Sequence, residues 1–283
     1  MSKSTRVLLI VLLMILVGIF VFCGIQLYGI YKDYYDGRKA HEGLAGLAVS
    51  VNPDYQEEVF EFPITTMVPV AGAEQDPVSH RPASETGEIT GRSERSPITV
   101  DFPVLFEINE DVKAWLYSPD TIINYAVVQT DNNSYYLHRL VDKSYNPGGS
   151  LFIDYRCPDD FSGKNTIIYG HHMGDGSMLA SIVEYRNQEY YDAHPVMYLN
   201  TPDGNYRLDV VSGFITYFDS RAYLYEFDSR TEFDEWFTLM RSYSDFVSDV
   251  EFGSDDRLVT LSTCTYEYDN ARYVLMAKLV PIG

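Results

Sequence analysis

Residues 259–275 read VTLSTCTYEYDNARYVL, a stretch that predicts two strands joined by a loop. The apolar, β-branched residues before Cys264 predict a strand, because such side chains fit a pleated, half-buried surface. The acidic, Asn-containing stretch TYEYDN predicts a loop, and the run that starts at Ala271 predicts a second strand. We therefore expect a β-hairpin with a cysteine at the end of its first strand.

Short runs of the same kind recur upstream of this hairpin. They are rich in Val, Ile, Tyr, Phe and Thr, and Gly, Pro, Asn and Asp bound them. The six runs are IINYAVVQ (122–129), SLFIDY (150–155), NTIIYGH (165–171), YRLDVVSGFITYF (206–218), RLVTLSTC (257–264) and ARYVLMAKLVPI (271–282). Many short strands with few helices favour a mainly β fold, either a closed or nearly closed barrel or a sandwich.

Three segments have the apolar spacing of short helices. INEDVKAWLY (108–117) places Ile108, Val112, Trp115 and Leu116 on one helical face. MLASIVEYRN (178–187) is the second segment, and SRTEFDEWFTLMRSY (229–243) is the third. In the third, Ser229 and Glu232 have capping-box spacing. Its apolar stripe, which we interpret as core packing, consists of Phe233, Trp236, Phe237 and Met240.

The N-terminal part of the chain divides into four segments before the packed domain. Residues 7–27 form an apolar run long enough to cross a hydrocarbon core of about 30 Å as a helix. We expect an uncleaved signal anchor with residues 1–6 inside and the bulk of the protein outside; a cleaved signal peptide is the alternative. Residues 28–51 are compatible with a stalk helix. Residues 52–97, rich in Pro, Ser, Thr, Glu and Gly, predict a flexible linker before a domain at 98–283.

Charge and cysteine content limit the possible functions. The formal net charge of −20 argues against nucleic-acid binding, which requires a basic surface for phosphate contacts. The chain has three cysteines, of which Cys23 lies in the apolar run. Cys157 and Cys264 permit either one disulfide, as is common outside the cytoplasm, or a reactive thiol.

Three side chains at the ends of predicted strands suit nucleophilic acyl transfer. Cys264 ends one strand, His171 follows the strand that closes with Gly170, and Arg272 begins the strand after the hairpin loop. A thiolate can attack a carbonyl, an imidazolium can protonate the leaving amine, and a guanidinium can stabilise the oxygen. On spacing alone, an exposed Arg272 in an ion pair with Glu267 or Asp269 is favoured over a catalytic role.

A metal site is not supported by the sequence. His171 and His172 are adjacent, and neighbouring side chains of an extended segment point in opposite directions. No set of His, Asp and Glu residues at ligand spacing completes a zinc site around them. We therefore expect neither a metal nor another cofactor.

Four ordered blocks of this sequence resemble the class B sortase family. TLSTC, followed by Arg272, resembles the TLxTC…R signature, and the TLSTC form is typical of class B. The other three blocks are IINYAVVQTDNNSYYL (122–137), GGSLFIDYR (148–156) and NTIIYGHHMGDGSM (165–178). The family normally has proline where this chain has Ala126, a difference that concerns strand geometry more than chemistry.

The resemblance implies a sortase-type closed β-barrel of about eight strands, with residues 229–243 as the helix inserted between two late strands. It also implies that Cys264, His171 and Arg272 are catalytic, and that His172 occupies a variable position. Cys264 would cut a sorting signal of secreted proteins at a Thr–Gly or Thr–Asn bond through an acyl-thioester. A peptidoglycan precursor amine would then accept the acyl group on the outer face of the cell membrane.

The resemblance implies less about substrate contacts. Positions that line the class B groove match Asn133, Leu137, Tyr169 and Ser262, although each could instead be structural. The family's N-terminal helix normally lies near the barrel, so residues 28–51 either dock there or are held apart by the long linker.

Three other functions can be compared with this sequence. A pilus-building sortase often has a lid with an Asp-Pro-aromatic anchor, where this chain has Asp76-Pro77-Val78. An L,D-transpeptidase would show a Ser-x-Gly-Cys motif, which is absent. A non-catalytic, membrane-tethered interaction module is the third.

Overall fold

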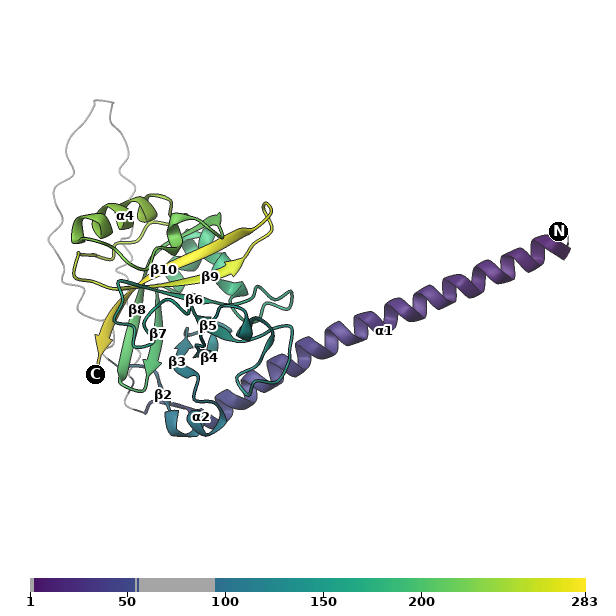
Figure 1. Ribbon diagram of the computed structural model, residues 1–283, viewed down its shortest axis with the longest axis horizontal. Coiled ribbons are helices and arrows are strands. Elements are labelled where there is room, and N and C mark those ends of the chain that lie inside the picture. Colours follow the sequence, from purple (N-terminus) through teal and green to yellow (C-terminus); the bar gives the residue numbers. More distant parts are fainter. Residues whose placement is uncertain (1–2, 54, 56–94) are drawn as a thin grey trace, which may run out of the picture.

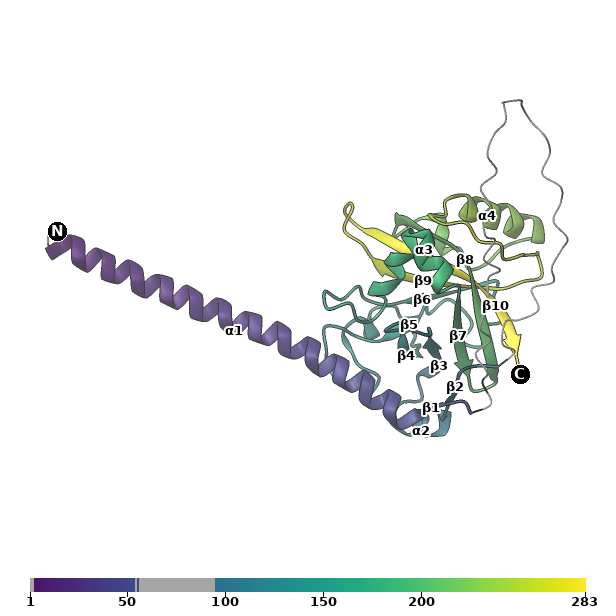
Figure 2. The same cartoon turned by 180° about the vertical axis from the view of Figure 1, so that it is seen from behind.

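The computed structural model describes residues 3–53, 55 and 95–283. These residues form a long N-terminal helix, a two-stranded ribbon and a barrel with short helices around it (Figure 1). The helices α2 (Phe102–Ile108) and α4 (Arg230–Ser242) lie at opposite ends of the barrel in both views (Figures 1 and 2).

Eight strands of the described chain close into one barrel in the order β10-β8-β7-β3-β4-β5-β6-β9. The β4–β5 and β6–β9 pairs are parallel, and the other pairs are antiparallel. The strands are β3 Val112–Tyr117, β4 Asn124–Val128, β5 Leu151–Ile153, β6 Asn165–Tyr169, β7 Val196–Thr201, β8 Gly204–Tyr217, β9 Leu258–Cys264 and β10 Ala271–Ile282. The expected barrel is confirmed, and its closure removes exposed strand edges.

All six strand runs expected from the sequence coincide with barrel strands, and the β9–β10 hairpin is present. Their apolar side chains build a large buried cluster inside the barrel and under its peripheral helices. A second cluster lies on the side where α1 and α2 pack, around Trp115.

The helix expected over residues 108–117 is wrong. A short helix, α2, covers Phe102–Ile108, and Asp101 caps it by accepting a hydrogen bond from the backbone N of Val104 at 3.3 Å. Residues 112–117 form β3 between β4 and β7. This strand is covered on both faces, so it lacks the alternation that distinguishes a strand from a helix. Its consecutive, fully buried residues are Ala114, Trp115 and Leu116.

The other helical expectations fit more closely. Residues 180–186 form the 3₁₀ helix η2 (Ala180–Arg186), followed by α3 (Gln188–Ala193). The helix α4 (Arg230–Ser242) lies between β8 and β9, and Ser229 Oγ accepts from the backbone N of Glu232 at 3.1 Å. Its predicted stripe is buried: Phe233, Trp236, Phe237 and Met240.

The N-terminal helix α1 (Lys3–Ala48) is continuous for 46 residues, or about 69 Å at 1.5 Å per residue. Its first part projects away from the barrel (Figure 2), exposes its apolar side chains, and is long and apolar enough to cross a membrane. The stalk helix expected over 28–51 ends at Ala48, because β1 (Val49–Val51) pairs with β2 (Ile98–Val100).

The ends of the predicted linker lie side by side. The backbone N of Asn52 donates to the carbonyl O of Pro97 at 2.9 Å. Most of the predicted linker, with the Asp76-Pro77-Val78 segment, lies outside the described residues.

The second half of α1 docks on the barrel. Asn146 Nδ2 donates to the carbonyl O of Asp33 at 2.9 Å, and the buried His41 donates through Nε2 to the carbonyl O of Gly149 at 3.0 Å. Leu44 and Ala48 are buried in the cluster around Trp115. Of the two arrangements left open by the sequence, α1 adopts the docked one.

We expect acid to weaken the fold through His41. Burial lowers its pKa, so between its folded and unfolded pKa the unfolded chain binds a proton that the folded chain does not. Stability therefore falls as the pH drops through and below about 6.5, the unfolded value. The thermal midpoint of the full-length protein in detergent should drop more between pH 7.5 and pH 5 than that of His41→Gln. Identical drops in both proteins would contradict this assignment.

Candidate active site

The β9–β10 hairpin places Cys264 opposite Arg272. The two residues are direct partners in the antiparallel register, so their side chains lie on the same face with Cβ atoms about 5 Å apart. Cys264 is the last residue of β9 and the first of that strand that is not fully buried. A thiol and a guanidinium thus share one face at the loop end of the hairpin.

The parallel pairing of β6 with β9 brings His171 to the same end of the barrel. Tyr169 of β6 pairs with Ser262 of β9 in the register of these two strands. His171 and Cys264 each follow that pair by two residues along their own segments. The backbone N of Gly170 donates to the carbonyl O of Ser262 at 3.1 Å, and Thr263 Oγ1 donates to the carbonyl O of Gly170 at 2.8 Å.

Two leucine side chains pack closely against Gly170. A Cβ atom there would lie 2.4 Å from Leu151 Cδ2 and 2.7 Å from Leu179 Cγ. The glycine therefore fixes the path of the chain immediately before His171.

The imidazole of His171 is held by backbone and ring contacts. Its Nε2 donates to the carbonyl O of Leu137 at 2.8 Å, and its ring stacks on His138 with centroids 5.9 Å apart. Burial lowers the pKa of His171, with a smaller contribution from the charge of Arg272, and outweighs the hydrogen bond to Leu137, which raises it. The neutral form is therefore favoured, and Nδ1 remains as the nitrogen that can take up a proton.

All seven residues singled out in the sequence line one cavity of about 340 Å³. They comprise the three candidate catalytic residues and the four candidate contacts, Asn133, Leu137, Tyr169 and Ser262. Five further residues that the sequence did not indicate complete the lining: Phe152, Gly170, Phe218, Tyr223 and Thr263.

Comparisons with known proteins point to one protein family. A family model described as the sortase domain matches residues 116–280. The sortase B of Listeria monocytogenes is 36% identical over 178 residues, which are 62% of this chain and 72% of that protein. The sortase B of Staphylococcus aureus is 30% identical over 184 residues, covering 64% of this chain and 75% of that protein.

The chain belongs to the class B sortase family. Class B sortases are cysteine transpeptidases. Solved structures of sortase B share the fold of this chain. The crystal structure of S. aureus sortase B superposes with a TM-score of 0.62 at 30% identity, covering 65% of this chain and 88% of that one. Bacillus anthracis sortase B in complex with AAEK1 gives a TM-score of 0.66 at 28% identity, covering 89% of this chain and 100% of that one.

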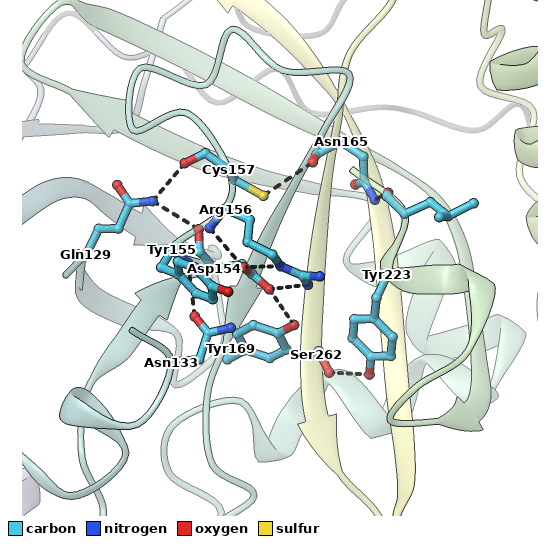
Figure 3. Close-up of polar contacts among 11 residues, drawn as sticks. Gln129, Asn133, Asp154, Tyr155, Arg156, Cys157, Asn165, Tyr169, Tyr223 and Ser262 are labelled. Carbon is cyan, nitrogen blue, oxygen red and sulfur yellow. Dashed lines mark hydrogen bonds and ion pairs between the residues drawn. The ribbon is translucent and has the colours of Figure 1, made fainter. Parts of the chain in front are cut away.

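The cavity wall of this sortase includes Tyr223, which no sequence motif indicated. Tyr223 ends the 3₁₀ helix η3 (Arg221–Tyr223), and Trp236 of α4 holds η3 by donating through Nε1 to the carbonyl O of Arg221 at 2.7 Å. The hydroxyls of Tyr223 and Ser262 are 2.8 Å apart and hydrogen-bonded (Figure 3). Burial raises the pKa of Tyr223 to about 12, so it stays neutral.

The simpler interpretations from the sequence do not hold in this sortase. Glu267 pairs with Arg186, and within the described residues Arg272 has no carboxylate partner. Arg272 instead donates through Nη1 to the carbonyl O of Ala271 at 2.9 Å. The three cysteines are free, so the possible disulfide between Cys157 and Cys264 is not formed.

His172 lies behind the cavity. It donates through Nδ1 to the carbonyl O of Cys264 at 3.0 Å, and its ring packs against Tyr266 with centroids 5.6 Å apart. His172 is not among the residues that line the cavity. Across the described ranges, no cluster of three or more His, Cys, Asp or Glu side chains is arranged to hold a metal ion.

Proposed function

We propose that this sortase cleaves the C-terminal sorting signal of secreted proteins at a Thr–Gly or Thr–Asn bond. The observation that carries the proposal is the meeting of Cys264, His171 and Arg272 at the end of three neighbouring strands, in one cavity. A solved S. aureus sortase B, 30% identical to this chain, is in complex with a substrate, which supports peptide binding here.

The three residues account for each step of the reaction. The Cys264 thiolate attacks the threonine carbonyl carbon, and Arg272 stabilises the oxyanion that forms. The C–N bond breaks as His171 gives its proton to the leaving amine, which leaves an acyl-thioester on Cys264. A second amine attacks the thioester, forms a new amide and releases the thiol. Because the pKa of His171 is lowered, only a minority of molecules hold the required imidazolium at neutral pH.

The proposed acceptor and location follow from the N-terminal helix. In this proposal residues 7–27 anchor the enzyme in the cell membrane with its N-terminus inside. Docking of α1 then holds the barrel close to the outer face of that membrane. From Leu27 to Asp33, where docking begins, the helix rises only about 9 Å. A peptidoglycan precursor amine at that surface is then within reach as the acceptor.

A peptide panel with an added amine tests this function. The full-length protein in detergent is incubated with fluorogenic peptides that contain a Thr–Gly or Thr–Asn bond, with and without a primary amine. We expect cleavage after threonine, and ligation of the threonine carbonyl to the amine. Cleavage of no peptide, or cleavage only at other bonds, would contradict the proposal.

Arg272→Lys is expected to lower kcat/KM for these peptides about 100-fold, because an ammonium cannot reproduce the fixed fork of donors around the oxyanion. The matched control is Arg186→Lys, which keeps the charge beside Glu267 on the neighbouring loop. That variant should stay within about twofold of wild type, as expected for a partly exposed ion pair. Near-normal activity of Arg272→Lys would remove Arg272 from the proposed mechanism.

A further inference from the structure

A buried carboxylate lies beneath the cavity wall. Asp154 follows β5, and its side chain is 0% exposed. It accepts from Arg156 Nε at 2.9 Å, from Arg156 Nη2 at 2.7 Å and from Tyr169 Oη at 2.9 Å (Figure 3). Burial alone would raise the pKa of Asp154, but these hydrogen bonds outweigh it and hold the pKa below its usual value. Asp154 is therefore a charged acceptor for both neighbours.

Tyr169 connects this carboxylate to the cavity. Its hydroxyl binds Asp154, while its ring lines the cavity beside two other aromatic rings. The ring centroid lies 5.4 Å from that of Phe152 and 6.1 Å from that of Tyr223, on which it stacks. The orientation of the Tyr169 ring thus depends on where Asp154 holds the hydroxyl.

Arg156 reaches the other part of the same wall. Its guanidinium lies over the ring of Tyr225, 4.7 Å from the centroid, in the segment that follows Tyr223. Asn165 Nδ2 fixes that segment as well, by donating to the carbonyl O of Leu224 at 2.8 Å. The pair therefore contacts both segments that supply the stacked tyrosines of the wall.

The contribution of the Asp154–Arg156 ion pair to the free energy of unfolding does not explain why the pair is present. The Asp154 carboxylate is fully buried while the Arg156 side chain is 36% exposed, and the cost of removing the carboxylate from water offsets much of the attraction between the two charges. What the pair supplies is geometry, because the planar guanidinium and the carboxylate fix two hydrogen bonds at once.

We propose that Asp154 and Arg156 are positioning residues, which set the wall of Tyr169 and Tyr223 against apolar side chains of the bound sorting peptide. Neither residue lines the cavity, so each acts through the tyrosines. The proposal rests on the proposed peptide-cleaving function and adds to it a determinant of substrate recognition.

The test compares KM with kcat in the full-length protein on the fluorogenic peptides. Asp154→Asn keeps the size of the side chain but removes its charge, and it places an amide among the donors of Arg156 and Tyr169. We expect KM to rise about tenfold, which corresponds to the free energy of one hydrogen bond. The kcat should stay within about threefold of wild type. Tyr169→Phe keeps the ring and should raise KM in the same direction. In the double variant the two effects should be less than multiplicative, because they share one hydrogen bond.

A second Arg–Asp pair in the barrel provides the matched control. Arg207 donates to Asp209 through Nε at 2.8 Å and Nη2 at 3.2 Å, with the same two-residue spacing, and neither residue lines the cavity. The side chains are 14% and 6% exposed. We expect both Asp209→Asn and Asp154→Asn to lower the thermal midpoint, while the KM of Asp209→Asn stays within about twofold of wild type.

Three results would overturn the positioning role. These are a wild-type KM in folded Asp154→Asn, an equal rise of KM in Asp209→Asn, and a wild-type KM in Tyr169→Phe. The last is decisive by itself if Asp154→Asn does not fold. Wild-type cleavage is read first: no cleavage of any peptide overturns the proposed function together with the positioning role. An active wild type with unchanged KM in these variants overturns the positioning role alone.

Discussion

Cys264→Ala is expected to abolish peptide cleavage and amine ligation, with kcat at least about 10³-fold below wild type. Without the thiolate no acyl-thioester can form, and no other cysteine lines the cavity. The variant should still bind the peptides, because the aromatic wall and Arg272 remain in place. Measured turnover of the fluorogenic peptides by the full-length variant tests this expectation.

Cys157→Ala is the matched control for the thiol. Cys157 is buried, its Sγ lies 3.7 Å from the carbonyl O of Asn165, and burial raises its pKa to about 11. It is therefore protonated and inaccessible at neutral pH. Activity of Cys157→Ala should match wild type in kcat and KM. Cleavage that survives Cys264→Ala but disappears in Cys157→Ala would reverse the assignment of the nucleophile.

His171→Ala is expected to reduce kcat about 10³-fold, because the leaving amine then departs without a positioned proton donor. The adjacent histidine gives a close control. His172→Ala removes the hydrogen bond to the carbonyl O of Cys264 and the ring contact with Tyr266, so a loss of about fivefold is expected. Single-turnover cleavage rates of the two variants at neutral pH provide the measurement. Equal losses of activity in the two variants would indicate that the segment with His171 and His172 acts only by holding Cys264 in place.

The sequence indicated the barrel because most of its strands are bounded by turn residues and rich in β-branched side chains. It misassigned β3, since a strand buried on both faces reproduces the apolar spacing of a helix. It also missed β7, although Pro195 and the Pro202-Asp203-Gly204 turn bound its run of apolar residues. For β3 the neighbouring strands β4 and β7, rather than the local pattern, determine the structure.

The candidate catalytic residues were accessible from the sequence because each lies at a strand end within a recognisable block. Tyr223 was not, since its position depends on the contact between Trp236 and Arg221 and on the hydrogen bond to Ser262. The role of Asp154 was also hidden. Its block resembles the family pattern, but only the folded barrel brings Tyr169 onto its carboxylate. Walls built from distant segments leave little local signal.

Docking of α1 was another feature that the sequence left open. Polar contacts from Asn146 and His41 hold the helix, and neither residue has a local pattern that predicts a distant partner. Because α1 is continuous from the apolar run to the docked segment, the barrel cannot rotate relative to the apolar run without breaking α1 or its contacts. The proposed position of the barrel near the membrane surface rests on that continuity.

Direct detection of the acyl-enzyme tests the central claim. The full-length protein is mixed with a Thr–Gly or Thr–Asn peptide in the absence of an amine, quenched with acid, and examined by intact mass followed by peptide mapping. We predict a mass increase equal to the acyl half of the peptide, located on Cys264 and discharged when a primary amine is added. Cleavage with no adduct on Cys264, or an adduct on another residue that turns over with the amine, would contradict the account.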